Sequence, residues 1–214
     1  MKAEPTFLRD FQIHISREIL VRLLGAGTGA AQLREDTLRM IQKEEELSKK
    51  LLHPQGVCQI LENRQLEGLD YLRDHKLSGL ALCTIGPELE NKVKELMATG
   101  QEPEGYVLDA IGSVAAEATA DVVNAKICHW AATHDLVATP RFSPGYGDWS
   151  LEEQRVIFSL LPAEKIGMRL NPSCMMIPRK SVSFAVTFRK EDEAQKIKSP
   201  CERCGLENCP FRKT

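Results

Sequence analysis

The sequence has no excess of basic residues, no long apolar run and no internal repeat, and each absence excludes a class of protein. Its 28 lysines and arginines stand against 30 aspartates and glutamates, a formal net charge of −2, so it lacks the basic character of nucleic-acid-binding proteins. No apolar run is long enough to cross a bilayer. Residues 1–11, MKAEPTFLRDF, lack the continuous apolar segment of a secretory signal. We therefore expect a cytoplasmic protein with no nucleic-acid or membrane partner.

The composition is that of an ordinary globular protein. The 214 residues are 43% hydrophobic and 27% charged, which suits one fairly large domain, with or without an appendage. Three of the seven cysteines, Cys58, Cys83 and Cys128, lie in apolar or helical segments. Because disulfides are rare in reducing compartments, we expect these thiols to be buried and to pack as small hydrophobic groups.

Hydrophobic periodicity predicts a chain that mixes helices and strands. The predicted strands are residues 10–15, 80–85 and 182–188, and the predicted helices are residues 17–24, 37–52, 87–97, 104–134 and 151–160. Residues 175–177 are expected to form an antiparallel neighbour of strand 182–188. Ser16 is suited to cap the first helix and Gly25 to end it. Residues 57–62 and 68–72 show no clear pattern.

A glycine-rich segment, GAGTG at residues 25–29, has two interpretations. It resembles the turn that binds S-adenosylmethionine in Rossmann-type methyltransferases, which requires a strand before it and a helix after it within a βαβ unit. The residues before Gly25 read REILVRLL and have helical spacing instead. We therefore favour a helix end followed by a turn, and the methyltransferase site is the alternative.

The predicted helix 104–134 carries a polar stripe beside its apolar one. The polar residues recur at spacings of three and four: Asp109, Ser113, Glu117, Asp121, Asn124 and Cys128. Glu117 and Asp121 are like charges one helical turn apart, an arrangement that costs roughly 0.2–0.5 kcal/mol. A solvated acidic face is the commoner explanation of this stripe, and the lining of a ligand cleft is the alternative.

The stretch Arg141–Trp149, RFSPGYGDW, combines a cation, a Pro-Gly turn and three aromatic rings. Gly145 is suited to a positive φ, and Gly147 would let a ligand approach the backbone. The guanidinium of Arg141 matches a carboxylate or a phosphate, and Tyr146 offers a flat face and a hydroxyl. The stretch therefore suits a flat, charged small molecule. The alternative, which composition alone slightly favours, is a surface turn that its aromatic rings hold to the core.

A cysteine array follows a charged linker at residues 190–198. Cys201, Cys204 and Cys209 have C-x2-C-x4-C spacing, which suits zinc or an iron–sulfur cluster. Structural sites of either kind usually have four protein ligands, so Cys174 or a ligand from outside the chain would complete the site, or one position stays open. The alternative is a tail with unmetallated thiols, and the spacing does not distinguish zinc from iron–sulfur.

Several of these segments together resemble a known family. RFSPGYG at residues 141–147 is followed by IGMRLNPSCMMIPRKSVSF at residues 166–184, and LCTIGPELE and LDAIGSVAAEATAD lie upstream. They are similar to the activation domain of cobalamin-dependent methionine synthase, from roughly Leu80 to Phe188 and more weakly towards the start of the chain. The Arg-x-Ser-Pro-Gly-Tyr core is the most specific part of the resemblance.

The resemblance implies an α+β fold in which helices flank a twisted antiparallel sheet. Residues 1–190 would form the activation-like domain, and residues 191–214 a linker and a cysteine-rich tail. The family site binds S-adenosylmethionine, and the positions here that match it or lie beside it are Glu117, Arg141, Pro144, Gly145, Tyr146, Val186 and Thr187. The resemblance implies that Arg141 contacts the bound cofactor. A carboxylate at Glu117 would suit the ligand's cationic end.

The resemblance also implies a function. In that family the domain docks on a corrinoid protein whose cobalt has been oxidised to the inactive Co(II) state, and one-electron reduction with methyl transfer from S-adenosylmethionine restores methylcobalamin. This chain would then be a methyltransferase component rather than a complete enzyme, with cobalamin supplied by a partner. The partner would be a methionine synthase core or a related corrinoid protein, and the electron donor is not identified.

Two features depart from the family pattern. Gly147-Asp148-Trp149 stands where the long synthases usually continue Pro-Ala-Cys-Pro, and those synthases lack the cysteine tail. Since the sequence contains no homocysteine, folate or cobalamin module, we expect a stand-alone form, in which a cluster bound by the tail carries the electron. The remaining alternative is a non-catalytic interaction module stabilised by a metal.

Overall fold

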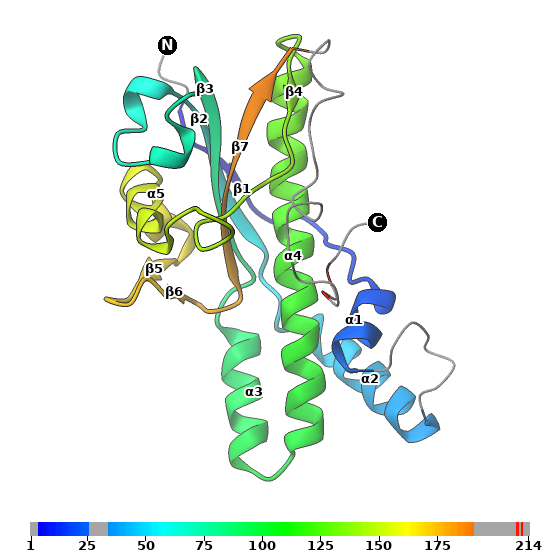
Figure 1. Ribbon diagram of the computed structural model, residues 1–214. Coiled ribbons are helices and arrows are strands. Elements are labelled where there is room, and N and C mark those ends of the chain that lie inside the picture. Colours follow the sequence, from blue (N-terminus) through cyan, green and yellow to red (C-terminus); the bar gives the residue numbers. More distant parts are fainter. Residues whose placement is uncertain (1–3, 26–33, 191–208, 210, 212–214) are drawn as a thin grey trace.

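The computed structural model describes residues 4–25, 34–190, 209 and 211, and within them the chain mixes strands and helices (Figure 1). The strands are β1 (Thr6–Leu8), β2 (Gln55–Glu62), β3 (Leu77–Thr84), β4 (Val137–Ala138), β5 (Arg169–Leu170), β6 (Met176–Ile177) and β7 (Ser181–Arg189). The helices are α1 (Arg17–Leu23), α2 (Glu35–Ser48), α3 (Glu88–Ala98), α4 (Glu102–Ala132) and α5 (Gln154–Leu160). Short 3-10 turns are η2 (Asn63–Gln65), η3 (Asp70–Leu72), η4 (Leu151–Glu153) and η5 (Ala163–Ile166).

Five strands form one antiparallel sheet in the order β1-β2-β3-β7-β4. The central strand β3 pairs with β2 on one side and with β7 on the other, so that Leu80 lies opposite both Gln59 and Ala185. Every residue of β3 except the first is buried. A separate two-stranded ribbon is formed by β5 and β6. The predicted α+β fold, an antiparallel sheet with flanking helices, is therefore confirmed.

Helical elements cover both faces of the sheet (Figure 1), because successive side chains of each strand point to opposite faces. On one face, Leu80 and Leu82 belong to a core cluster that includes Ile157 of α5. On the other face, Ala81 of β3 belongs to a cluster that includes Val123 of α4. The helix α4 thus covers one face of the sheet, and the site described below lies on that face.

The first half of α4 extends beyond the sheet, where α3 runs beside it and α1 and α2 lie on its other side (Figure 1). The clusters there bring Leu20 and Ile41 against Ile111, and Leu89 of α3 against Leu108. The apolar periodicity of this helix therefore predicted a real packing surface, although it packs against three other helices as well as the sheet.

Local signals placed the first helix correctly. The Ser16 hydroxyl accepts a hydrogen bond from the Ile19 amide at 3.4 Å, and Gly25 follows the helix with φ of 83°. Because a helix precedes Gly25 and the sheet is antiparallel, the strand–turn–helix unit of a Rossmann-type site is not formed at this glycine. Residues 26–33 of the glycine-rich segment lie outside the described residues.

The predicted strand 10–15 is wrong, and β1 lies earlier, at Thr6–Leu8. The alternation in this segment is real, because Phe11 and Ile13 are half-buried whereas Gln12 and His14 are exposed. Asp10 has φ of 54°, which turns the chain out of the sheet after β1. The segment therefore buries alternate side chains without a ladder partner.

The predicted pairing of residues 175–177 with strand 182–188 is also wrong. The short strand β6 pairs with β5, with Met176 opposite Leu170. It does not pair with β7, whose ladder partners are β3 along one edge and β4 at Phe188 and Arg189. The strand β2 gave no clear pattern in the sequence because it has buried side chains on both faces, among them Val57 and Cys58.

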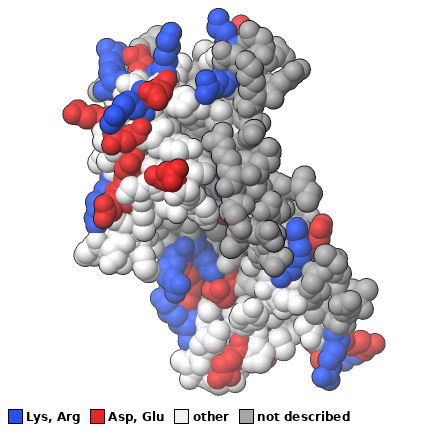
Figure 2. Space-filling model, viewed as in Figure 1, with Lys and Arg blue, Asp and Glu red and all other residues white. Residues whose placement is uncertain are grey.

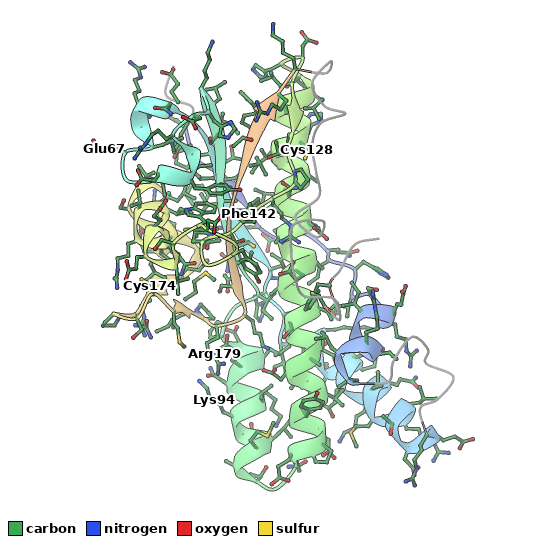
Figure 3. The ribbon with its side chains drawn as sticks, in the orientation of Figure 1. Glu67, Lys94, Cys128, Phe142, Cys174 and Arg179 are labelled. Atoms are coloured by element: carbon green, nitrogen blue, oxygen red, sulfur yellow. The ribbon has the colours of Figure 1, made fainter. Side chains whose placement is uncertain are left out.

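Cys58 and Cys83 are buried, as predicted, and Cys128 is half-buried on α4 (Figure 3). Burial raises the pKa of the Cys58 thiol to about 11 and that of the Cys83 thiol to about 12. These thiols are therefore protonated at neutral pH and pack as apolar groups. No helix within the described part of the chain has the length and apolar character needed to span a membrane.

Candidate functional site

The site begins at an irregularity in the pairing between β4 and β7. Ala138 lies opposite Phe188, and a later bridge places Phe142 opposite Ala185. Between these two pairs lie residues 139–141 on one side but only Val186 and Thr187 on β7. The extra residue is accommodated as a β-bulge. In a regular ladder residue 141 would lie opposite Ala185, on the α5 face. The bulge instead directs Arg141 to the α4 face.

On that face Arg141 lies against two carboxylates of α4. Its Nη2 atom donates to Glu117 Oε2 at 2.7 Å and to Asp121 Oδ1 at 3.0 Å. The Arg141 side chain is only 16% exposed, whereas those of Glu117 and Asp121 are 35% and 51% exposed. The guanidinium is therefore mostly buried, and the two carboxylates that it contacts are more exposed to solvent. Burial alone would lower the pKa of Arg141, but the two adjacent carboxylates raise it, so the cation is fixed.

The same contacts explain the acidic stripe of α4. Glu117 and Asp121 repel each other one turn apart, and Arg141 compensates both charges from a segment 20 or more residues away in the sequence. The guanidinium carbon lies 5.8 Å from the centre of the Phe184 ring, close enough for a cation–π contact. The middle of the polar stripe is therefore not simply a solvated face.

The first two residues of the polar stripe of α4, Asp109 and Ser113, contact a different cation. Lys180, immediately before β7, contacts Asp109 Oδ1 at 2.9 Å and donates to Ser113 Oγ at 2.8 Å. Its backbone N–H donates to Glu90 of α3 at 2.6 Å. Basic and acidic side chains lie together beside α3 in Figure 2. These contacts join β7 to the α3–α4 pair, so Asp109 and Ser113 are structural rather than part of the Arg141 cluster.

The loop after Arg141 is held at both ends by stacked aromatic rings. The rings of Phe142 and Trp149 each lie 4.9 Å from the ring of Tyr71, with interplanar angles of 19° and 12°. Trp149 is 2% exposed, and its indole N–H donates to Glu153 at 2.8 Å. Tyr71 comes from η3, in a segment without a clear sequence pattern. The alternative prediction of a turn pinned to the core thus describes the two ends of this loop.

Between these ends the loop projects outwards. The Gly145 N–H donates to the Trp149 carbonyl at 2.8 Å, which closes the turn, and Pro144 is buried beneath it. Gly145 and Gly147 have φ of 89° and 55°, so the positive φ predicted for Gly145 is confirmed. Tyr146 is 63% exposed. The tip therefore presents a tyrosine side chain on a backbone that only glycines adopt easily.

Val186 and Thr187, two further predicted binding residues, lie in β7 beside the bulge. The Val186 side chain is buried in the cluster against α4. The Thr187 N–H donates to Thr139 Oγ1 at 3.0 Å, and the Thr187 carbonyl accepts from the Thr139 N–H at 2.9 Å. The backbone polar groups of Thr187 are thus already satisfied within the protein. Contact of a ligand with either residue stays a prediction.

The predicted metal centre falls largely outside the described residues, which include Cys209 but neither Cys201 nor Cys204. Cys174 is 4% exposed and lies in the segment between β5 and β6 (Figure 3). Within the part of the chain that the structure describes, no three His, Cys, Asp or Glu side chains are grouped to hold a metal ion. Metal binding by the tail therefore stays a prediction.

Comparison with known proteins identifies the family. The model of the vitamin B12-dependent methionine synthase activation domain matches residues 30–197. The chain therefore belongs to this family of activation domains. Its structure is similar to a crystal structure of the MetH reactivation domain bound to AdoHcy, with a TM-score of 0.66, 16% sequence identity, and coverage of 87% of this chain and 78% of that chain. At this identity the likeness shows the fold. No protein with a curated description matches the sequence.

Proposed function

We propose that the chain binds S-adenosylmethionine beside Arg141 and Glu117 and supports the reductive methylation of a cobalamin carried by a partner protein. Membership of the activation-domain family supports this assignment, as does the AdoHcy bound to the structurally similar domain. The observation that carries it is the Arg141–Glu117–Asp121 cluster, which places a cation suited to a carboxylate beside two partly exposed carboxylates.

The charged groups of S-adenosylmethionine fit this donor set. The ligand has one carboxylate, one ammonium and one sulfonium group, so it needs a cation at one end and anions near the other. Arg141 supplies N–H donors for the carboxylate, and Glu117 and Asp121 supply anions for the positive groups. Tyr146, exposed at the tip of the loop that follows Arg141, offers a ring for contact with the ligand.

The protein's contribution in this proposal is positioning and electrostatics. S-adenosylmethionine supplies the methyl group, and the partner's cobalamin accepts it once an external donor has provided one electron. Arg141 would orient the amino-acid part of the ligand, and the loop 143–149 would cover it at the side that the partner approaches. The partner class that fits is a methionine synthase core or a related corrinoid protein.

Calorimetric titration of S-adenosylmethionine tests the binding site directly. We expect saturable binding to the wild type and at least tenfold weaker binding to R141A, since loss of a charged hydrogen-bond partner costs about 1.5–3 kcal/mol. R39A is the matched control, because Arg39 also pairs with a carboxylate, Glu35, but on α2. Equal affinities of R141A and the wild type would refute the assignment of the site.

A further inference from the structure

The bulge that directs Arg141 towards α4 is built around Thr139. This residue contacts Thr187 of β7 through its backbone and through its side chain. Its N–H donates to the Thr187 carbonyl at 2.9 Å, and its Oγ1 accepts from the Thr187 N–H at 3.0 Å and lies 3.3 Å from the Thr187 hydroxyl oxygen. A side-chain hydroxyl therefore takes the place that a backbone carbonyl has in a regular ladder.

Pro140, the next residue, excludes one of the two regular pairings that could replace the bulge. Phe142 and Ala185 exchange both of their backbone hydrogen bonds, at 2.9 and 2.8 Å. Two residues further along such a ladder, the next hydrogen-bonded pair would be Pro140 with Thr187. Proline has no N–H to donate to the Thr187 carbonyl. The N–H of Thr139 satisfies this carbonyl instead.

The other regular pairing has no such obstacle, but it would turn Arg141 away from the site. It extends the register of β4 and β7, so that the Thr139 carbonyl would accept from the Thr187 N–H. Arg141 would then lie opposite Ala185 and face α5, because a shift of one residue exchanges the two faces of a strand. The Thr139 hydroxyl competes with the carbonyl of the same residue for one N–H, and it thereby favours the bulge.

We propose that Thr139 is a positioning residue for S-adenosylmethionine, because its hydroxyl stabilises the bulge that places Arg141 beside Glu117. This inference rests on the proposed function. Thr187 is 7% exposed, so without the hydroxyl its N–H would lose its acceptor and have little access to water. The chain would regain this hydrogen bond in the regular register, in which Arg141 leaves α4. Thr139 therefore acts on the ligand through Arg141 and needs no contact with it.

The size of the effect follows from the cost of an unpaired buried N–H. That cost shifts the balance between two conformations by roughly five- to a hundredfold. Only molecules with the bulge present Arg141 to the ligand, and the apparent affinity falls with their fraction. T139V removes the hydroxyl and keeps a β-branched side chain, so we expect it to bind S-adenosylmethionine more weakly by about fivefold or more. T139S keeps the hydroxyl and should bind like the wild type.

Calorimetry with S-adenosylmethionine compares the wild type, T139V, T139S, R141A and the double variant T139V/R141A. If Thr139 acts through Arg141, the double variant should bind no more weakly than R141A alone. The matched control is T84V, because Thr84 Oγ1 also accepts from a backbone N–H, that of Gly86, at 3.2 Å. Thr84 lies opposite Ser181, at the other end of β7, so T84V should keep the affinity of the wild type.

A second measurement follows Arg141 without any ligand. Its guanidinium carbon lies 5.8 Å from the centre of the Phe184 ring, so nuclear Overhauser contacts between the two side chains report the bulged conformation. We expect these contacts in the wild type, T139S and T84V, and weaker contacts in T139V. Thermal unfolding shows whether each variant is folded, and T139A repeats the test without the hydroxyl if T139V is not.

A folded T139V that keeps both the affinity and the Arg141–Phe184 contacts of the wild type would refute the inference. Equal losses of affinity in T139V and T139S, or a further loss in the double variant relative to R141A, would refute it as well. In each case the proposed function stands if the wild type binds S-adenosylmethionine. A folded wild type that does not bind would overturn the proposed function, while the contacts of Arg141 still decide whether Thr139 positions it.

Discussion

At the residue scale, Arg141 shows how one side chain joins parts of the molecule that lie far apart in the sequence. It leaves the sheet at a bulge, covers the Phe184 ring of β7 and contacts Glu117 and Asp121 on α4. These residues could be singled out in the sequence, but their contact in the folded protein could not be predicted from it. The polar stripe marked Glu117 and Asp121, and the motif marked Arg141, whereas their pairing depends on the bulge.

A second charged residue has a role in stability rather than in the site. Glu44 of α2 is 1% exposed, and its Oε2 atom has no hydrogen-bond partner among the described residues. Lys43 lies 3.7 Å from the other carboxylate oxygen. Burial raises the pKa of Glu44 above 4.5, and the charge of Lys43 only partly opposes this. The folded state therefore favours the protonated carboxyl.

A raised folded-state pKa makes Glu44 more costly as the pH rises. At a pH below the unfolded-state value both states are protonated and the cost is absent, and it grows until the pH exceeds the raised folded-state value. We therefore expect the free energy of unfolding of E44Q, relative to the wild type, to increase between pH 4 and pH 7. Urea unfolding across this range measures it, with E46Q on an exposed carboxylate of the same helix as the control. A difference that is constant with pH would contradict the prediction.

At the scale of elements, the aromatic stack joins η3 to the two ends of the loop that follows Arg141. Replacing Tyr71 with alanine removes two ring contacts, each of which contributes about 0.5–1.5 kcal/mol. We expect Y71A to lose about 1–3 kcal/mol in the free energy of unfolding and to bind S-adenosylmethionine more weakly, because the loop ends are no longer fixed. Y71F keeps the ring and should behave like the wild type. Equal loss in both variants would show that the hydroxyl, not the stack, matters.

The close approach of α4 to the sheet depends on a glycine. A Cβ on Gly56 of β2 would overlap the Val123 Cγ2 methyl group, so G56A should lose about 1–3 kcal/mol in the free energy of unfolding. If this contact is the cause, V123A should relieve it, and the double variant should be more stable than the two single losses predict by ~1 kcal/mol. Denaturant unfolding of all four proteins tests this, and simple additivity would exclude the contact as the cause.

Elements with strong local signals could be predicted, and those defined by distant partners could not. Ser16 and Gly25 bound the first helix, and the apolar period of α4 extends over its whole length. By contrast, the alternation around Ile13 has no ladder partner, and the partner of β6 is β5 rather than the longer strand that follows it. Tyr71 was missed because its stacking partners lie 71 or more residues away.

At the scale of the whole molecule, the family resemblance of several segments, of which residues 141–147 are the most specific, was sufficient to predict the fold, because it identified a domain rather than a single element. The matched region, residues 30–197, covers all the elements of the sheet except β1. Ligand contact by Val186 and Thr187 stays a prediction, and the backbone N–H and carbonyl of Thr187 are already bonded to Thr139.

The cysteine tail makes a separate prediction about the whole chain. If Cys201, Cys204 and Cys209 bind zinc or an iron–sulfur cluster, the metal should co-purify anaerobically at a fixed ratio to protein, and C201S/C204S should lose it. Elemental analysis with sulfide determination distinguishes the two metals, and C58S controls for a buried thiol outside the array. Zinc without iron would remove the role of the tail as an electron carrier, and metal-free protein would refute the site.

The measurement that tests the central claim most directly is methylation of a cobalamin carried by a methionine synthase core that lacks its own activation domain. The core is prepared with Co(II), and this chain, methyl-labelled S-adenosylmethionine and a low-potential one-electron reductant are added. We expect labelled methylcobalamin to form only when the chain is present and to be strongly reduced with R141A. The contradicting result has two parts. Titration shows that the chain binds S-adenosylmethionine, yet no core of several classes is methylated above the control without the chain.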